Sequence, residues 1–162
     1  MNEVLFFSSN HFLRFLQNQN EKITPNKLNL IFENQNEKKI KQISSSDFST
    51  IFLFKNGKAI EYLNENNSNQ NPEKIQIEEN IQKVTVGYRN EAILTKEGNV
   101  FAKGKDINPK NPKEFVNISS LIEDKNDRII QDTVCSFSSI YLLTSNQNAY
   151  GIGLNEFSQL WF

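Results

Sequence analysis

Short apolar runs separated by polar turns are the dominant pattern along the chain. Three of these runs have the length of a buried β-strand, and each is preceded by one apolar stretch and followed, after a turn, by another. The pattern therefore predicts β-strands throughout. The expected strands are 40–43, 51–54 and 58–62; 81–86, 92–95 and 99–103; and 129–134, 140–144 and 148–152. Weaker strands are expected between these groups, at 28–32, 75–77 and 115–118.

The turns in the three groups differ at one position. Gly57 and Gly98 supply the positive φ angle that a tight hairpin needs. Gln147 stands at the equivalent place in the third group. We therefore expect the third turn to be looser, or to have Asn146 or Asn148 in the left-handed conformation.

Self-comparison shows that the three groups are copies of one unit. Residues 84–104 align with 43–63 and with 133–153, and all 6 Gly lie inside these copies. Four strands repeated every 40 to 50 residues or so are typical of β-propeller blades. We therefore expect one all-β domain, an incomplete propeller of about three blades, each a four-stranded antiparallel sheet. The expected domain is 1–162, with repeat units at about 4–58, 59–99 and 100–148 and the start of a further unit at 149–162.

In this register the copies resemble the repeats of the regulator of chromosome condensation family. The matching positions serve turns and close strand packing in such repeats. Where the family has His before the apolar run, this chain has Ser49, Asn90 and Ser139. The matching residues are Gly57, Gly87, Thr95, Gly98, Gly104, Thr144, Gly153 and Asn155.

The resemblance implies a seven-bladed ring, and about three blades cannot close one. We therefore expect either a fragment or terminal part of a larger signalling or regulatory protein, or a chain that completes its ring by oligomerisation. Relatives in this family often carry BTB or other signalling domains beside the propeller, which implies a signalling or ubiquitin-pathway context.

Composition excludes several classes of protein. The net charge of −1 lacks the basic excess of a strong nucleic-acid binder, so we do not expect nucleic acid as the partner. No apolar run approaches the ~20 residues that span a bilayer, so no membrane partner is expected. One Cys and one His leave little for disulfides or zinc sites. We expect a cytoplasmic protein, with the nucleus as the alternative location.

No residue stands out as catalytic, cofactor-binding or metal-ligating. His11 lies in a loop motif without a companion triad, and Cys135 falls in an expected buried strand, where Cys behaves as a small apolar residue. The carboxylates of Glu79 and Asp127 lie in polar loops and are interpreted as solvated charges. We therefore predict a protein that is not an enzyme and has no cofactor.

Aromatic and lysine residues are the remaining candidates. Most of the aromatic side chains are expected to pack between blades: Phe52, Phe54, Tyr62, Phe101, Phe137 and Tyr141. The loop 105–113 has a local positive balance, and we predict a partner-binding role for Lys105, Lys110 and Lys113. No aromatic residue is interleaved with these lysines, which argues against nucleic acid. The second candidate loop is 64–72.

The leading hypothesis is a non-catalytic protein–protein interaction module, or scaffold, whose loops on one rim bind an unidentified protein. Guanine-nucleotide exchange on a Ran-like small GTPase, which the resemblance implies through the family's founder, is the alternative. A chromatin-binding propeller is a third option, disfavoured by the net charge of −1.

Overall fold

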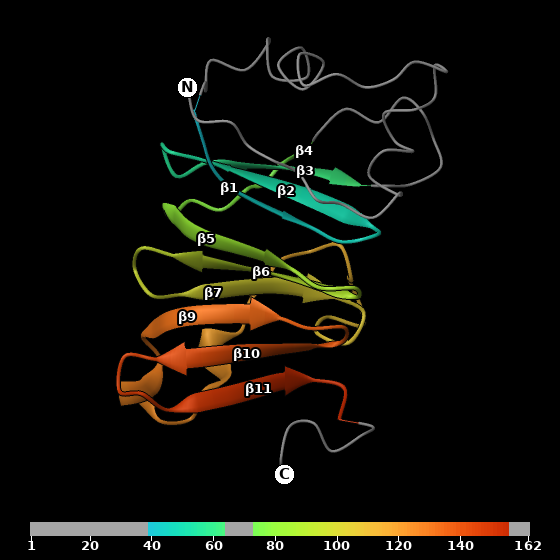
Figure 1. Cartoon of the computed structure of the whole chain (residues 1–162). Helices are drawn as coiled ribbons and strands as arrows, with labels where there is room; N and C mark the ends of the chain where they lie inside the picture. The colour runs from blue at the N-terminus through green and yellow to red at the C-terminus, as the bar shows by residue number, and fades with distance from the viewer. Residues whose placement is uncertain (1–38, 64–72, 156–162) are drawn as a thin grey trace, which may run out of the picture.

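Three antiparallel sheets follow one another along the chain in the computed structural model, which describes residues 39–63 and 73–155 (Figure 1). The first sheet has the order β1 (Ile40–Ser45), β2 (Ser49–Phe54), β3 (Ala59–Leu63) and β4 (Glu73–Lys74). The second has the order β5 (Ile81–Val86), β6 (Asn90–Thr95), β7 (Val100–Gly104) and β8 (Val116–Asn117). In the third, β10 (Ser139–Thr144) lies between β9 (Ile130–Cys135) and β11 (Ala149–Gly153). The expectation of about three all-β blades is confirmed.

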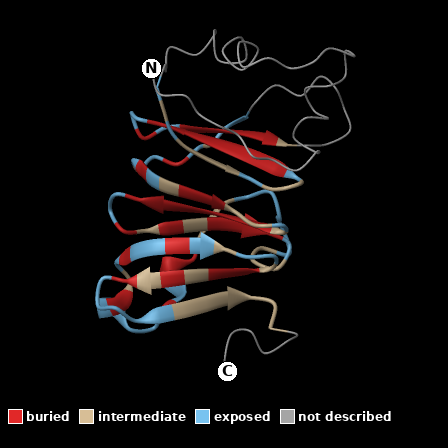
Figure 2. Ribbon diagram, in the orientation of Figure 1, coloured by how far each residue is buried: buried red, intermediate tan, exposed pale blue. Residues whose placement is uncertain are grey.

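The sheets stack face to face like neighbouring blades. The first strand of each sheet lies close to the first strand of the next, β1 against β5 and β5 against β9. One buried cluster, which includes Ile51 and Ile93, fills the space between the first two sheets. Another, which includes Leu94 and Leu142, lies between the second and third sheets. Figure 2 shows that burial is most complete on inner strands such as β2 and β6, as packing of apolar sheet faces against neighbouring sheets requires.

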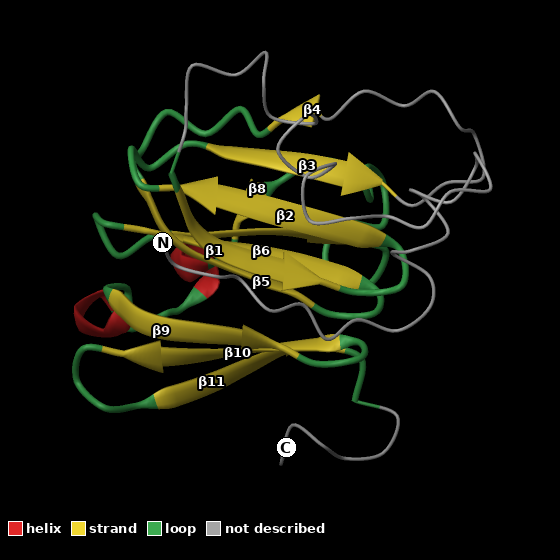
Figure 3. Ribbon diagram, turned by 45° about the horizontal axis from the view of Figure 1, so that its top comes forward, coloured by secondary structure: helices red, strands yellow, loops and turns green. Residues whose placement is uncertain are grey.

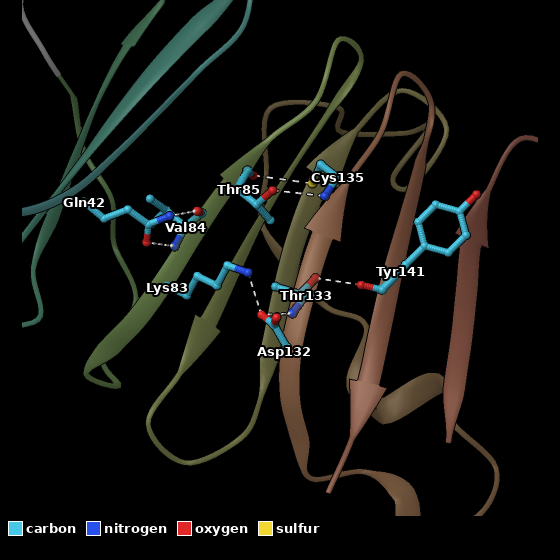
Figure 4. A network of polar contacts seen from close by, with 8 residues as sticks. All are labelled: Gln42, Lys83, Val84, Thr85, Asp132, Thr133, Cys135 and Tyr141. Carbon is cyan, nitrogen blue, oxygen red and sulfur yellow. Dashed lines mark hydrogen bonds and ion pairs between the residues drawn. The ribbon is translucent and has the colours of Figure 1, made fainter. Parts of the chain in front are cut away.

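Polar contacts between the first strands fix the order of the stack (Figure 4). The Gln42 side chain donates from Nε2 to Val84 O at 2.7 Å and accepts from Val84 N at 3.1 Å. One sheet further on, Cys135 N donates to Thr85 Oγ1 at 3.0 Å. These side chains satisfy backbone groups on strand edges that would otherwise lie buried without partners.

The hairpin turns correct one expectation. Gly57 and Gly98 have φ of 81° and 83°, and Gln147 itself takes the equivalent conformation with φ of 67°. Neither neighbouring Asn is left-handed. The third turn is also as tight as the others, since Thr144 N donates to Asn148 O at 2.9 Å. The hairpin geometry is imposed by strand pairing, and a non-glycine residue is held in the costly left-handed region.

Several strand boundaries also differ from the expected ones. The short outer strand of the first sheet is Glu73–Lys74 rather than 75–77, and β9 begins at Ile130 rather than at residue 129. The expected strand 28–32 lies outside the described residues. The expected units 59–99 and 100–148 each begin part-way through a sheet, so unit 59–99 contains β3 and β4 of one sheet with β5 and β6 of the next.

Two three-residue 3-10 helices, η1 (Ser119–Leu121) and η2 (Lys125–Asp127), lie in the connection between the second and third sheets (Figure 3). Within the described ranges, no helix has the length and apolar character to cross a membrane.

Candidate functional site

One end of the stack carries the candidate loop 105–113 together with three shorter loops. Because neighbouring strands are antiparallel, the odd-numbered first and third strands of every sheet end on the same side, at the right in Figure 1. We call this side the loop rim and define it by the loops 46–48, 87–89, 105–115 and 136–138. The other candidate loop, 64–72, is outside the described residues.

Three exposed aromatic side chains form a continuous ridge along the loop rim, one from each sheet. Phe48, Tyr88 and Phe137 are 52%, 39% and 61% exposed. The Phe48 and Tyr88 ring centroids are 4.7 Å apart at an interplanar angle of 74°. The Tyr88 and Phe137 rings stack, with centroids 4.3 Å apart and an angle of 10°. The expectation that Phe137 packs in the core is therefore wrong, because its loop points it to solvent.

A pocket of about 200 Å³ opens beside this ridge, between the first and second sheets. Two of the three candidate lysines, Lys105 and Lys113, line it, while Lys110 does not. The structure thus brings aromatic rings next to lysines that are far from any exposed aromatic residue in the sequence. The other lining residues are Ser46, Phe48, Ser49, Leu63, Gly87, Tyr88, Arg89, Asn90, Glu91, Lys103, Gly104 and Pro112.

Buried charges form the wall of the pocket. Lys103 Nζ lies 2.5 Å from Glu61 Oε2 and 3.3 Å from Glu91 Oε2, and the ammonium also lies 4.9 Å from the centroid of the Phe115 ring. Ser49 Oγ donates to Glu91 Oε1 at 2.5 Å. Burial and, to a smaller extent, the negative charge of Glu61 raise the pKa of Glu91 to about 7, against the opposing effects of Lys103 and Ser49. Two carboxylates therefore share one buried cation.

The positions where the family has His connect neighbouring sheets at this rim. Ser49 reaches Glu91 in the second sheet, and Asn90 Nδ2 donates to Ser139 O in the third at 3.5 Å. Arg89 N also donates to Phe137 O at 2.9 Å. A hydrogen bond thus joins the loops of Tyr88 and Phe137, and the Ser49–Glu91 bond joins the first two sheets close to the ridge.

Glycine positions at the rim permit close packing. A Cβ built on Gly87 would lie 2.0 Å from Ser136 O, across the boundary between two sheets. Gly104 and Gly153 occupy equivalent strand ends, with φ of 139° and 130°, and a Cβ on either would collide with a backbone carbonyl. Asn155 closes the described part of the chain just beyond β11.

At the opposite rim, a carboxylate that precedes the sheet accepts hydrogen bonds from the hairpin turn, in both the second and the third sheet. We call each such group of contacts a polar latch. The interpretation of these two carboxylates as solvated is therefore wrong. Glu79 Oε2 accepts from Thr95 Oγ1 at 2.6 Å, and both of its carboxylate oxygens accept from Asn99 Nδ2 at 3.0 Å. In the third sheet, Asp127 is buried and its oxygens accept from the equivalent Thr144, at 3.5 Å, among other donors. These threonines therefore tie each hairpin turn to the connection that precedes its sheet.

Asp127 makes the fuller of the two latches. Its oxygens also accept from Asn146 Nδ2 at 3.0 Å, and from Asn148 Nδ2 and the Tyr150 hydroxyl at 2.7 Å. These hydrogen bonds, chiefly that of Tyr150, lower the pKa of Asp127.

The remaining candidate for chemistry is Cys135. Burial raises the pKa of its thiol to about 12, and Sγ donates to Thr85 O at 3.4 Å, so the reactive thiolate is disfavoured. Over the described ranges, no group of acidic, His and Cys side chains has the arrangement of a metal site. His11 lies outside these ranges.

Comparison with protein-family models found no match, and comparison with curated proteins found none either. Among solved structures, human WBSCR16 matches with a TM-score of 0.60 and 18% identity over 75% of this chain and 36% of that one. Prp20p from Saccharomyces cerevisiae, a protein studied for its binding to Gsp1p and histones, matches with a TM-score of 0.57 and 14% identity over 75% of this chain and 34% of that one. The C-terminal domain of gp131 from bacteriophage phiKZ matches with a TM-score of 0.54 and 11% identity over 84% and 43%.

The chain thus spans about a third of the length of WBSCR16 and Prp20p. Likeness at this level of identity describes the fold. The three stacked sheets are blades of a β-propeller of the type found in the regulator of chromosome condensation family.

Proposed function

We propose that the chain is a non-catalytic protein–protein interaction module whose loop rim binds a protein partner. The observation that carries this proposal is the exposed aromatic ridge of Phe48, Tyr88 and Phe137. Exposed aromatic side chains on rigid loops supply much of the binding energy in protein interfaces. The ridge is contiguous across three blades and so offers an area larger than any single loop.

The geometry of the ridge favours a protein partner over a nucleic acid. Tyr88 and Phe137 stack on each other at 4.3 Å, so the facing sides of these two rings are not open to a base. Lys103 is neutralised by two buried carboxylates, and Arg89 lies 3.7 Å from Asp106, which reduces the positive charge beside the ridge. Lys105 and Lys113 remain beside the ridge, but two cations are fewer than the extended basic surface that a phosphate backbone needs.

The candidate loop adds specificity to the apolar ridge. Lys105 and Lys113 line the pocket together with Phe48 and Tyr88. A polar or acidic group of the partner placed there would fix the orientation of an apolar contact, as charges at the edge of an interface do. Lys110 is exposed outside the pocket and contributes through the general charge of the loop.

Capture of a partner tests the proposal. We expect the Phe137→Ser variant to bind the partner at least about tenfold more weakly than the wild type. Removal of an interface aromatic residue costs ~2 kcal/mol or more of binding free energy. Val134→Ser, which changes an exposed apolar residue of β9, is the matched control and should retain the partner. Equal retention by both variants, with unchanged thermal unfolding, would contradict the proposal.

Guanine-nucleotide exchange on a Ran-like small GTPase is the second candidate. Its support is the fold, which is similar to that of Prp20p, a protein that binds Gsp1p. The chain spans about a third of that protein. Exchange is therefore a more specific proposal than binding of a protein partner, and it needs a test of its own. The test is release of labelled GDP from a Ran-type GTPase. Acceleration that is lost in Phe137→Ser would support exchange at the loop rim, and an unchanged rate of release would remove this candidate.

A further inference from the structure

The buried charges between the first two sheets are not balanced one against one. Lys103 Nζ lies 2.5 Å from Glu61 Oε2 and 3.3 Å from Glu91 Oε2, so two carboxylates face a single cation. Glu61, Glu91 and Lys103 are all buried. With both carboxylates ionised, the cluster carries one excess negative charge, which is costly at a site that little water reaches. A proton on one of the two carboxyl groups removes this charge.

The geometry indicates that Glu91 takes this proton. The shorter contact with Lys103 is made by Glu61, which therefore keeps its negative charge. Ser49 on β2 donates to Glu91 Oε1, but within the part of the chain that the structure describes Glu91 Oε2 accepts no hydrogen bond. Burial and, less strongly, the charge of Glu61 raise the pKa of Glu91 to about 7. Glu91 is thus close to half protonated at neutral pH.

The other titratable or charged groups around Glu91 leave this balance in place. The thiol of Cys135 on β9 stays neutral, because burial raises its pKa to about 12. Arg89 lies 3.7 Å from Asp106, which offsets its charge. Lys105 and Lys113 are exposed, so water and salt screen their charges from the buried carboxyl group. The charged residues that line the pocket beside Glu91 are Arg89, Lys103, Lys105 and Lys113.

The pocket of the loop rim is where the Glu91 side chain meets solvent. Glu91 lines this pocket of about 200 Å³, and 10% of its side chain is exposed. Apolar surface from Phe48, Leu63, Tyr88 and Pro112 lines the same space. An uncharged apolar side chain of a partner therefore fits the pocket. Such a group displaces the water beside Glu91 and makes its ionised form less favourable.

We propose that an uncharged apolar side chain of the partner fills this pocket, and that binding is coupled to uptake of one proton from solvent by the Glu91 carboxyl group. Filling of the pocket and protonation then favour each other, so the partner binds more tightly in mildly acidic than in mildly basic solution. A cationic side chain in the pocket would give the opposite dependence on pH, because its charge would replace the proton. The inference rests on the proposed function, since Phe48 and Tyr88 belong to both the ridge and the pocket.

Indole serves as an uncharged probe of the pocket, so the test needs no identified partner. The amide chemical shifts of Gly87 and Gly104, which line the pocket, measure its affinity by NMR at pH 6 and pH 8. We expect saturable binding that is at least about fivefold tighter at pH 6. Calorimetry near pH 7.5 in buffers of different ionisation enthalpy should show net proton uptake when indole binds. The cation n-butylammonium, charged at both pH values, should show no preference for pH 6.

Variants assign the proton to Glu91. Glu91→Gln should bind indole with nearly the same affinity at both pH values, because an amide does not titrate. Glu79→Gln, which changes a carboxylate at the opposite rim, should keep the dependence on pH. His11→Gln, which removes the only imidazole of the sequence, should keep it too. If Glu91→Gln does not fold, the ¹³C shift of the Glu91 carboxyl in the wild type, followed against pH with and without indole, makes the same assignment.

Three results would overturn the inference. The first is the absence of saturable indole binding at pH 6, and the second is equal affinity for indole at both pH values. The third is tighter binding of n-butylammonium than of indole at pH 8, which would assign the pocket to a cation. None of these results bears on whether Phe137→Ser loses the partner, so the inference and the proposed function can fail separately.

Discussion

Lys103 Nζ lies 2.5 Å from Glu61 Oε2, so a cation on β7 neutralises a carboxylate on β3 of the preceding sheet. Glu91 approaches the same ammonium from β6. All three side chains are at least nine-tenths buried beneath the pocket of the loop rim. The contact between the first two blades at this rim therefore depends on a balance of charges as well as on apolar packing.

Loss of the cation should destabilise the fold. We expect Lys103→Met to lower the free energy of unfolding by about 3 kcal/mol at pH 7, because two buried carboxylates lose their shared partner. Urea denaturation measures the change. The matched control is Lys83→Met, which breaks the 2.6 Å pair with Asp132 in a more exposed setting and should cost less than about 1 kcal/mol. Similar losses of unfolding free energy in both variants would contradict the larger role of the buried Lys103.

The raised pKa of Glu91 makes stability depend on pH. With a pKa near 7 in the folded chain and 4.5 in the unfolded chain, the folded state holds more protons between these values. The contribution of Glu91 to the stability of the fold is fully present below about pH 4.5 and is lost as the pH rises through 7. Chemical denaturation across pH 4.5–7.5 should show this decline in the wild type and a flatter profile in Glu91→Gln. Parallel profiles would contradict the assignment.

The latch at Glu79 should contribute to stability through a specific pair. Thr95→Val removes the hydroxyl that donates to Glu79 Oε2 at 2.6 Å and should cost about 1–2 kcal/mol, since a charged acceptor loses a donor. A double-mutant cycle with Glu79→Ala isolates the interaction, and we expect a coupling of about 1 kcal/mol. Additive effects of the two substitutions would show that the threonine stabilises the turn in another way.

Substitutions at equivalent positions of two hairpin turns should change the stability of the fold in opposite directions. Gln147→Gly should stabilise the chain by about 0.5–1 kcal/mol, because glycine adopts a φ of 67° without the steric cost that glutamine bears. Gly98→Val should destabilise it by more than about 1 kcal/mol, since φ is 83° and a Cβ would lie 2.8 Å from Ile129 Cγ2. Thermal unfolding compares the two. A loss of stability in Gln147→Gly would contradict this account of the third turn.

The polar pairs that connect one sheet to the next could not be predicted from the sequence. Glu61 and Lys103 are 42 positions apart, as are Ser49 and Glu91. Nothing in either local pattern marks these residues, because charged and hydroxyl side chains at strand positions are normally read as solvent-facing. They are buried because a second sheet covers them, and a repeat of about that length sets which residues meet.

The repeat and its strands were predictable because they rest on short-range rules. Alternation of apolar and polar residues, and glycine in tight turns, act within a few positions of the chain and predict hairpins whatever lies nearby. By itself the sequence thus determined most of the described strands and the repeat of the blades. Strand pairing in the third hairpin held Gln147 in a left-handed turn. Stacking of the sheets brought Phe48, Tyr88 and Phe137 together as one exposed ridge. Contacts between blades are set by the packing of whole sheets, which no local pattern encodes.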